Sequence, residues 1–210
     1  AGAEVELFDE DGRAQNLAND LVLSSKIDNP TIVVIATPTS ALSGVLSKFK
    51  TIYPKSTFID IGSTKTKVQV EVQTDSAFAS RFVPTHPMAG RELDGAEAAQ
   101  SDLFVGKSWI ITPLTETSDE SIALVKELIE KLGARVIAMS ADDHDAAVAT
   151  VSHLPQVISS LLAAQLENKS SDYLALAGTG VLDTTRIAGS NPDLWREILN
   201  LNREALLPLL

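Results

Sequence analysis

The chain has 210 residues, of which 44% are hydrophobic, so it can bury a sizeable core as one large or two small domains. Seventeen basic residues against 28 acidic ones leave a net charge of −11, which argues against a nucleic acid or an anionic membrane as the main partner. The chain has no cysteine, hence no disulfide and no thiolate chemistry, and we expect a cytoplasmic protein. The longest apolar segment, residues 146–166, is interrupted by polar side chains, so we do not expect it to span a membrane.

Short apolar runs alternate with helical patterns through the first 139 residues. Strands are predicted at residues 4–8, 31–36, 57–61, 81–84, 108–112 and 134–137. This alternation is typical of an α/β domain with a parallel sheet. Residues 68–72 alternate as a strand would, but a parallel sheet needs a crossover helix there, so we expect a helix.

Three helix ends have sequence signals. Thr39 or Ser40 is expected to cap a helix that follows the second predicted strand. Residues 117–120 have the spacing of a capping box, and Gly133 is expected to end the helix that this box begins. Near the other end of the chain, Ser190 or Asn191 precedes Pro192, which suits the first turn of a helix.

Polar loops follow two of the predicted strands. Residues 85–95 contain His86, Glu92, a proline and two glycines, and predict a tight loop with ionisable groups at the carboxyl end of a strand, where open α/β sheets bind ligands. The alternative is that His86 is only a turn residue. Asp9, in the acidic turn after the first strand, could accept hydrogen bonds from the ribose of NAD and repel the 2′-phosphate of NADP; a solvated turn is the alternative there.

From residue 140 onward the pattern predicts helices only. The spacing of the three histidines matches no zinc-binding pattern, so we expect no metal. Residues 146–166 and the leucine-rich C-terminus carry more apolar surface than this half can cover by itself. The sequence therefore predicts a two-fold homodimer formed mainly by residues 140–210.

Several motifs occur in a fixed order along nearly the whole chain. They are Asp60-Ile61-Gly62-Ser63-Thr64-Lys65, His86-Pro87-Met88-Ala89-Gly90 with Glu92 and Gly95, Leu103-Phe104, His144-Asp145, Ser152-His153-Leu154-Pro155, and Asp183-Thr184-Thr185-Arg186-Ile187-Ala188 with Pro192, Trp195 and Asn202. This set resembles the prephenate/arogenate dehydrogenases of tyrosine biosynthesis. The resemblance implies an α/β, Rossmann-like parallel-sheet nucleotide-binding domain at residues 1–139 and an all-α substrate and dimerisation domain at residues 140–210.

The resemblance also implies an oxidoreductase that carries out the NAD-dependent oxidative decarboxylation of prephenate to 4-hydroxyphenylpyruvate, with NADP as an alternative cofactor. His86 matches the catalytic histidine, Ser63 the residue that orients it, and Arg186 the arginine that binds a substrate carboxylate. The other expected site residues are, for the substrate, Glu92, Ser152, His153, Gln156 and Trp195, and for the cofactor, Asp9, Thr37, Pro38 and Ser63.

The chain departs from the family's pattern in three places. Gln156 stands where some members have histidine, and Val181-Leu182 stands where many have Phe-Arg, so arogenate remains an alternative substrate. The first strand and the Gly-x-Gly-x-x-Gly loop of the nucleotide domain are missing from the 210 residues, so a non-catalytic fragment that retains the dimerisation half is a second alternative. A different hydroxy-acid dehydrogenase is a third, against which the motifs around His86 and Arg186 argue.

Overall fold

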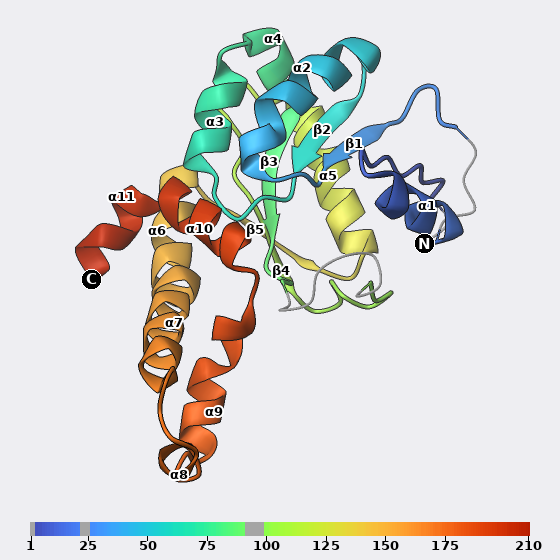
Figure 1. The fold of residues 1–210 in the computed structure, drawn as a ribbon. Helices are drawn as coiled ribbons and strands as arrows, with labels where there is room; N and C mark the ends of the chain where they lie inside the picture. The colour runs from blue at the N-terminus through green and yellow to red at the C-terminus, as the bar shows by residue number, and fades with distance from the viewer. Residues whose placement is uncertain (1–2, 22–25, 91–98) are drawn as a thin grey trace. The chain divides into compact units, whose positions relative to one another are not determined.

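The structure is a computed structural model that describes residues 3–21, 26–90 and 99–210. The chain forms two compact units, Ala1–Ser140 and Ala141–Leu210. Figure 1 shows a sheet with helices in the first unit and helices alone in the second.

The first unit is built on a five-stranded sheet whose strand order follows the chain, β1-β2-β3-β4-β5. The strands are β1 Ile32–Ile35, β2 Thr57–Asp60, β3 Phe82–Pro87, β4 Ser108–Ile111 and β5 Arg135–Ala138. The pairs β1–β2, β2–β3 and β4–β5 are parallel, as predicted, but β3 and β4 are antiparallel. Parallel pairing dominates the sheet, and one strand reversal lies in its middle.

Helices cover both faces of this sheet. The helices are α1 Gly12–Leu21, α2 Leu42–Ile52, α3 Thr66–Gln73, α4 Ser76–Ala79 and α5 Asp119–Lys131. Successive residues of β2 point to opposite faces: Phe58 packs with residues of α2, α3 and α4, and Ile59 packs with residues of α5. The helix expected at residues 68–72 is confirmed as α3, where Val68 and Val72 are buried and Val70 is exposed.

The strand predicted at residues 4–8 is wrong. These residues are not hydrogen-bonded in the sheet, and the register of β1 is with β2. A strand needs a neighbour with free backbone groups, and no strand in the described ranges supplies one to residues 4–8. Phe8 instead lies edge-on against Phe49 of α2, with ring centroids 5.8 Å apart.

Two of the predicted helix starts also differ. Ser118, not Thr117, is the N-cap of α5 and accepts a hydrogen bond from the backbone N–H of Ser121. The Thr117 hydroxyl donates to the carbonyl of Phe82, 2.9 Å away, and accepts from the N–H of Leu114. A 3₁₀ turn, η1 Thr39–Ala41, precedes α2, which has no side-chain cap. Gly133 follows the end of α5 with φ of 77°, as expected for a terminating glycine.

The second unit, residues 141–210, is described completely and consists of helices and turns, as predicted. Its elements are α6 Ala141–Val148, η3 Ala149–His153, α7 Leu154–Leu166, α8 Ser171–Leu174, α9 Thr179–Thr185, η4 Arg186–Gly189, α10 Pro192–Leu201, α11 Arg203–Leu206 and η5 Leu207–Leu209. The first three form one continuous helix of 26 residues, which by length and composition alone could also cross a membrane. Asn191 is the N-cap of α10, with Pro192 in its first turn.

The middle of that long helix is a π-helical turn, η3. The N–H of Leu154 bonds the carbonyl of Ala149, five residues back. Pro155 follows and has no N–H to offer the carbonyl of Val151, so a regular α-helical ladder cannot run through this point. The wider turn therefore has a local cause, and it carries Ser152 and His153.

Candidate functional site

Ser63 and His86 lie close to the same end of the neighbouring strands β2 and β3. Asp60 of β2 is paired with Pro84 of β3, and Ser63 and His86 lie three and two residues beyond that pair. Because β2 and β3 are parallel, both residues lie at the carboxyl edge of the sheet. Each is half-buried.

His86 lies on a strand and not in the loop that the sequence predicted. It is paired with Ile110 of β4, and the ladder continues as the N–H of Met88 donates to the carbonyl of Ser108, 2.8 Å away. The antiparallel β4 thus takes the backbone hydrogen bonds that a loop would leave to water. A histidine on a paired strand has a fixed backbone, which suits a residue that must hold one position.

A buried ion pair lies directly beneath this edge. The Lys65 side chain has no exposed surface, and its ammonium group forms a short ion pair with the carboxylate of Asp60, itself 3% exposed. The same ammonium donates to the carbonyl of Thr85, 2.7 Å away. Lys65 therefore joins the end of β2 to the residue that precedes His86.

Further hydrogen bonds close the same network. The N–H of Thr85 donates to Asp60 Oδ1 at 3.2 Å, and the Thr85 hydroxyl donates to the Asp60 carbonyl at 2.6 Å. Trp109 Nε1 donates to that hydroxyl at 2.9 Å. Gly62 completes the turn, because a Cβ there would lie 3.1 Å from Asp60 Oδ2 and 3.2 Å from Thr39 Oγ1. Sequence reasoning gave Asp60 and Lys65 no role, although an acidic residue at a strand end with lysine five positions on was visible.

Three of the four residues expected to hold the cofactor are exposed in the first unit, and the fourth is the half-buried Ser63. Thr37 and Pro38 follow β1 and are exposed. Asp9 is exposed in the turn before α1, where its Oδ1 accepts a hydrogen bond from the N–H of Asp11. The carboxylate of Asp11 in turn accepts from the N–H groups of Arg13 and Ala14 in the first turn of α1. The predicted acidic turn is thus present, although no strand precedes it.

In the second unit, Arg186 is exposed at the start of η4. Gln156 lies in α7, is buried, and donates through Nε2 to the carbonyl of Ile187, 3.0 Å away. This donor ties α7 to the turn that carries Arg186, and the role of Gln156 in substrate binding stays a prediction.

His153 is buried at the end of η3, and Ser152 beside it is half-buried. The ring of Trp195 from α10 meets the His153 ring edge-on, with centroids 5.9 Å apart and planes at 83°. Burial lowers the pKa of His153 from its ordinary 6.5 to about 4, because the charged ring loses water; Asp145 raises the pKa and His144 lowers it, both by smaller amounts. Glu92, the remaining predicted pocket residue, lies outside the described residues.

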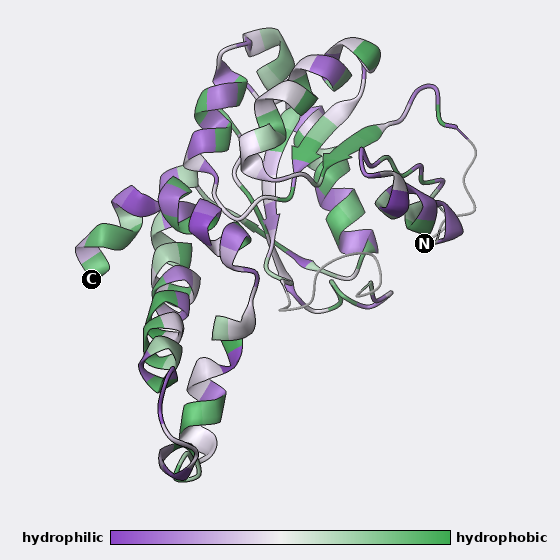
Figure 2. Ribbon diagram, viewed as in Figure 1, coloured by the Kyte–Doolittle hydropathy of each residue, from purple (hydrophilic) through white to green (hydrophobic). Residues whose placement is uncertain are grey.

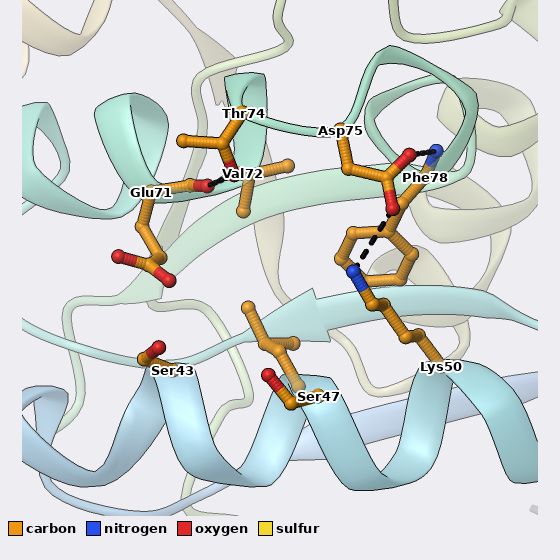
Figure 3. Close-up of a pocket in the computed structure, with 9 residues that line it drawn as sticks. Ser43, Ser47, Lys50, Glu71, Val72, Thr74, Asp75 and Phe78 are labelled. Atoms are coloured by element: carbon orange, nitrogen blue, oxygen red, sulfur yellow. Dashed lines mark hydrogen bonds and ion pairs between the residues drawn. The ribbon is translucent and has the colours of Figure 1, made fainter.

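A small hollow elsewhere in the first unit is structural in character. Figure 3 shows that it lies between α2 and the α3–α4 segment and is crossed by the ion pair of Lys50 Nζ with Asp75 Oδ2, at 2.9 Å. Asp75 also caps α4 by accepting from the N–H of Phe78. The Lys50 hydrogen bond and that N–H lower the pKa of the Asp75 carboxyl. Within the described ranges, none of the site residues predicted from the sequence lines this hollow.

Comparison with protein families covers both units. The nucleotide-binding domain of prephenate dehydrogenase matches residues 5–138, and the dimerization domain of prephenate dehydrogenase matches residues 140–210. The chain belongs to the prephenate dehydrogenase family. It is thus a member of a family of dehydrogenases, with a Rossmann-like nucleotide-binding domain followed by a helical one.

Individual members of the family support the same assignment. The cyclohexadienyl dehydrogenase of Zymomonas mobilis is 33% identical over 205 residues, which cover 94% of this chain and 70% of the relative. The prephenate dehydrogenase of Bacillus subtilis is 33% identical over 190 residues, which cover 87% of this chain and 51% of the relative. The chain thus spans about half the length of the Bacillus relative.

Solved structures agree with the family in both units. Prephenate dehydrogenase of Aquifex aeolicus, in complex with hydroxyphenyl propionate and NAD⁺, matches with a TM-score of 0.85 and 30% identity, covering 95% of this chain and 74% of that one. Arogenate dehydrogenase of Synechocystis matches with a TM-score of 0.77 and 29% identity, covering 95% and 75%. The two neighbours carry different substrate names, so family membership does not decide the substrate of this chain.

Proposed function

We propose that this protein catalyses the NAD-dependent oxidative decarboxylation of prephenate to 4-hydroxyphenylpyruvate. The observation that carries the proposal is the shared sheet edge of Ser63 and His86, held from beneath by Asp60, Lys65 and Thr85. A base on β3 and a hydroxyl in the turn after the neighbouring parallel strand β2 suit the removal of a proton from a substrate alcohol. The NAD⁺ and hydroxyphenyl propionate in the Aquifex neighbour support both the cofactor and an aromatic product.

The proposed reaction assigns one task to each residue. His86 takes the proton from the ring hydroxyl while hydride leaves the carbon that bears it. The bond from the ring to its carboxylate breaks, carbon dioxide departs, and the freed electron pair makes the ring aromatic as a phenolate, which regains a proton to give the 4-hydroxyphenyl group. When bound, NAD⁺ supplies the acceptor for the hydride. Ser63 orients the hydroxyl and His86, and Arg186 binds a substrate carboxylate with its planar guanidinium.

The described residues suit the nicotinamide end of the cofactor better than its pyrophosphate. Gly62 lets the turn after β2 come within van der Waals reach of Thr39 in the turn after β1. Exposed Thr37 and Pro38, with Ser63, would line this edge against a flat ring. The Gly-x-Gly-x-x-Gly sequence that cradles a pyrophosphate does not occur among the 210 residues.

The same proposal includes a preference for NAD over NADP. The exposed turn of Asp9 and Asp11 offers carboxylates, which accept hydrogen bonds from ribose hydroxyls and repel a phosphate dianion. Values of kcat/KM for the full-length protein with each cofactor test this preference. Comparable values for the two cofactors would remove Asp9 from cofactor selection.

Arogenate is the second candidate substrate, and one local observation favours it. Gln156 and Leu182 are uncharged, so neither position adds a cation for a keto acid side chain. Nε2 of Gln156 donates to the carbonyl of Ile187, and Leu182 is 63% exposed. The likeness to an arogenate dehydrogenase of Synechocystis, with a TM-score of 0.77, also supports this candidate. Initial rates of the full-length protein with prephenate and with arogenate, each with NAD and NADP, separate the candidates. If neither substrate is turned over, the proposed activity is wrong, and the non-catalytic fragment and a different hydroxy-acid dehydrogenase remain.

We also propose that residues 140–210 form a homodimer. Val151, Ile158 and Leu161 follow one face of the long helix and are 67%, 50% and 60% exposed. Only 28% of the most apolar 18-residue window of this helix is buried, and Figure 2 shows the apolar residues along α7. The match to a dimerization domain supports an interface here.

Light scattering on the full-length protein tests the dimer. Leu161→Glu should give a monomer at concentrations where the wild type is dimeric, because a charge would be buried at the interface. Val70→Glu is the matched control, since Val70 is 62% exposed on α3 of the first unit. A concentration-independent monomer mass for the wild type would contradict the proposal.

A further inference from the structure

The core of the second unit contains four buried polar residues that contact one another. His144 and Asp145 come from α6, His153 from η3, and Asn202 from the junction of α10 and α11; their exposed fractions are 0%, 5%, 1% and 3%. Their side chains have few solvent contacts, so the directions of their hydrogen bonds are set by one another.

Asn202 has only one possible orientation. Its amide Nδ2 lies 2.8 Å from the backbone carbonyl oxygen of Asp145, which can only accept a hydrogen bond. The atom assigned as nitrogen must therefore be nitrogen and not the amide oxygen. The same atom lies 3.0 Å from Nδ1 of His153. An amide nitrogen donates and does not accept, so Nδ1 of His153 accepts and carries no hydrogen.

His144 is fixed in the opposite way. Its Nδ1 lies 2.8 Å from the carboxylate oxygen Oδ1 of Asp145, which accepts, so Nδ1 of His144 carries a hydrogen. The backbone and the side chain of one residue, Asp145, thus determine the protonation pattern of two histidines. The imidazole of His153 is neutral, and its single hydrogen lies on Nε2.

We propose that Asn202 is a positioning residue that holds His153 in its neutral Nε2–H form, so that His153 donates a hydrogen bond to an oxygen of the substrate and does not act as a base. No hydrogen bond joins Nε2 to another of the described residues, which leaves this donor for a bound group. The edge-on contact with Trp195 fixes the plane in which the donor points. The lowered pKa of His153, about 4, agrees with a ring that stays neutral near pH 7.

This inference rests on the proposed function only in naming a substrate oxygen as the acceptor. A neutral Nε2–H can serve a carboxylate or a keto oxygen, and it has no lone pair for an ammonium group. His86 then remains the histidine that takes up a proton in the proposed reaction. His86 and His153 therefore have different roles: His86 accepts a proton, and His153 only donates a hydrogen bond.

Long-range ¹H–¹⁵N NMR spectra of the full-length protein test the protonation pattern without any substrate. The chain has three histidines, and a glutamine substitution at each assigns its signals. We expect Nδ1 of His153 to be bare and Nδ1 of His144 to be protonated, with His153 unchanged as the pH falls from about 8 to about 5.5. A hydrogen on Nδ1 of His153, or titration of its ring with a pKa near the ordinary value, would overturn the proposal whether or not the protein is an enzyme.

Asn202→Asp reverses the hydrogen bond and is the first variant. A carboxylate cannot donate, so Nδ1 of His153 should become protonated in the same spectra. Asn191→Asp is the matched control, because Asn191 caps α10 by accepting from the N–H groups of Asp193 and Leu194, which aspartate does equally well. The His153 signals should be unchanged in the control. If Asn202→Asp also leaves them unchanged, Asn202 does not set the tautomer.

Kinetics of His153 variants test the donor role. Glutamine places an amide N–H near the position of Nε2, whereas leucine has no donor. With the substrate that the rate assay identifies, we expect KM to rise about tenfold for His153→Leu and less than about threefold for His153→Gln, with kcat little changed in both. Equal losses in the two variants, or a loss confined to kcat, would overturn the donor role, and melting curves establish that both variants are folded.

Discussion

Replacing Lys65 by methionine should sharply destabilise the first unit. Lys65 is fully buried, and its ammonium group pairs with the carboxylate of Asp60 and donates to the carbonyl of Thr85. Methionine fills a similar volume but leaves the carboxylate, 3% exposed, without its cation. Loss of one partner of a buried ion pair costs about 3–5 kcal/mol, because the remaining charge can be neither hydrated nor neutralised cheaply.

The remaining contacts of Asp60 offset only part of that cost. Its carboxylate still accepts hydrogen bonds from the N–H groups of Gly62 and Thr85. We therefore expect a loss of about 3 kcal/mol, the lower end of the usual range. At about 2–4 °C per kcal/mol for a domain of this size, the melting temperature should fall by about 10 °C.

Urea unfolding followed by tryptophan fluorescence measures this loss. Trp109 is buried beside the network and donates to Thr85, so in a Trp195→Phe background its emission reports on the first unit. Lys67→Met is the matched control, because Lys67 is exposed on α3, and it should change the free energy of unfolding by less than about 0.5 kcal/mol.

A double variant separates charge from packing. Asp60→Asn with Lys65→Met leaves neither charge buried, so it should cost less than the sum of the two single losses. If the free energy of unfolding of Lys65→Met lies within about 1 kcal/mol of the wild-type value, the buried ion pair does not stabilise the first unit as we expect.

Three further predictions concern the histidines and Arg186. His86→Ala should leave the melting curve unchanged and lower kcat by about 10²–10⁴, the usual contribution of a positioned base; a rate within threefold of the wild type would remove His86 from the mechanism. Arg186→Lys should cost about 1.5–3 kcal/mol of substrate binding, seen as a raised KM, because a point charge cannot form two parallel hydrogen bonds. Arg196→Lys is its control, since Arg196 is 73% exposed in a surface ion pair, and equal KM values for the two variants would contradict the carboxylate role. The free energy of unfolding of the second unit should fall as the pH drops from 6.5 to about 4, because burial lowers the pKa of His153 to about 4 and the unfolded chain binds the proton first. The difference is at most about 3 kcal/mol, and His153→Gln should remove that part of the pH dependence in calorimetry; a variant with the wild-type slope would contradict it.

Local patterns in the sequence were sufficient for most of the secondary structure. The β-branched run at residues 31–36 became β1, and the helix at residues 68–72 followed from the need to connect parallel strands. Gly133 ended α5, and Asn191 began α10, because the backbone groups at helix ends must find partners close in sequence. Such features depend on contacts within a few residues, which the sequence displays directly.

Pairing between distant segments decided what the sequence did not. Residues 4–8 alternate correctly for a strand yet lack a partner, and His86 lies on a strand because β4, more than 20 residues later, pairs with it. Alternation shows which side a residue would face, and not whether a neighbouring strand is there to bond it.

The buried polar residues show the same limit at the site itself. The motifs around Ser63, His86 and Arg186 could be found in the sequence, because a family resemblance preserves residue types in order. A lysine in a sequence is expected to be exposed, and only the folded chain places Lys65 in the core against Asp60. Likewise His153 and Asn202 are 49 positions apart, and the protonation state of the histidine follows from a hydrogen bond that exists only after α6, η3 and α10 have packed together. The sequence by itself determined which groups are available; the tertiary structure determined their partners, and through the partners their charge and protonation.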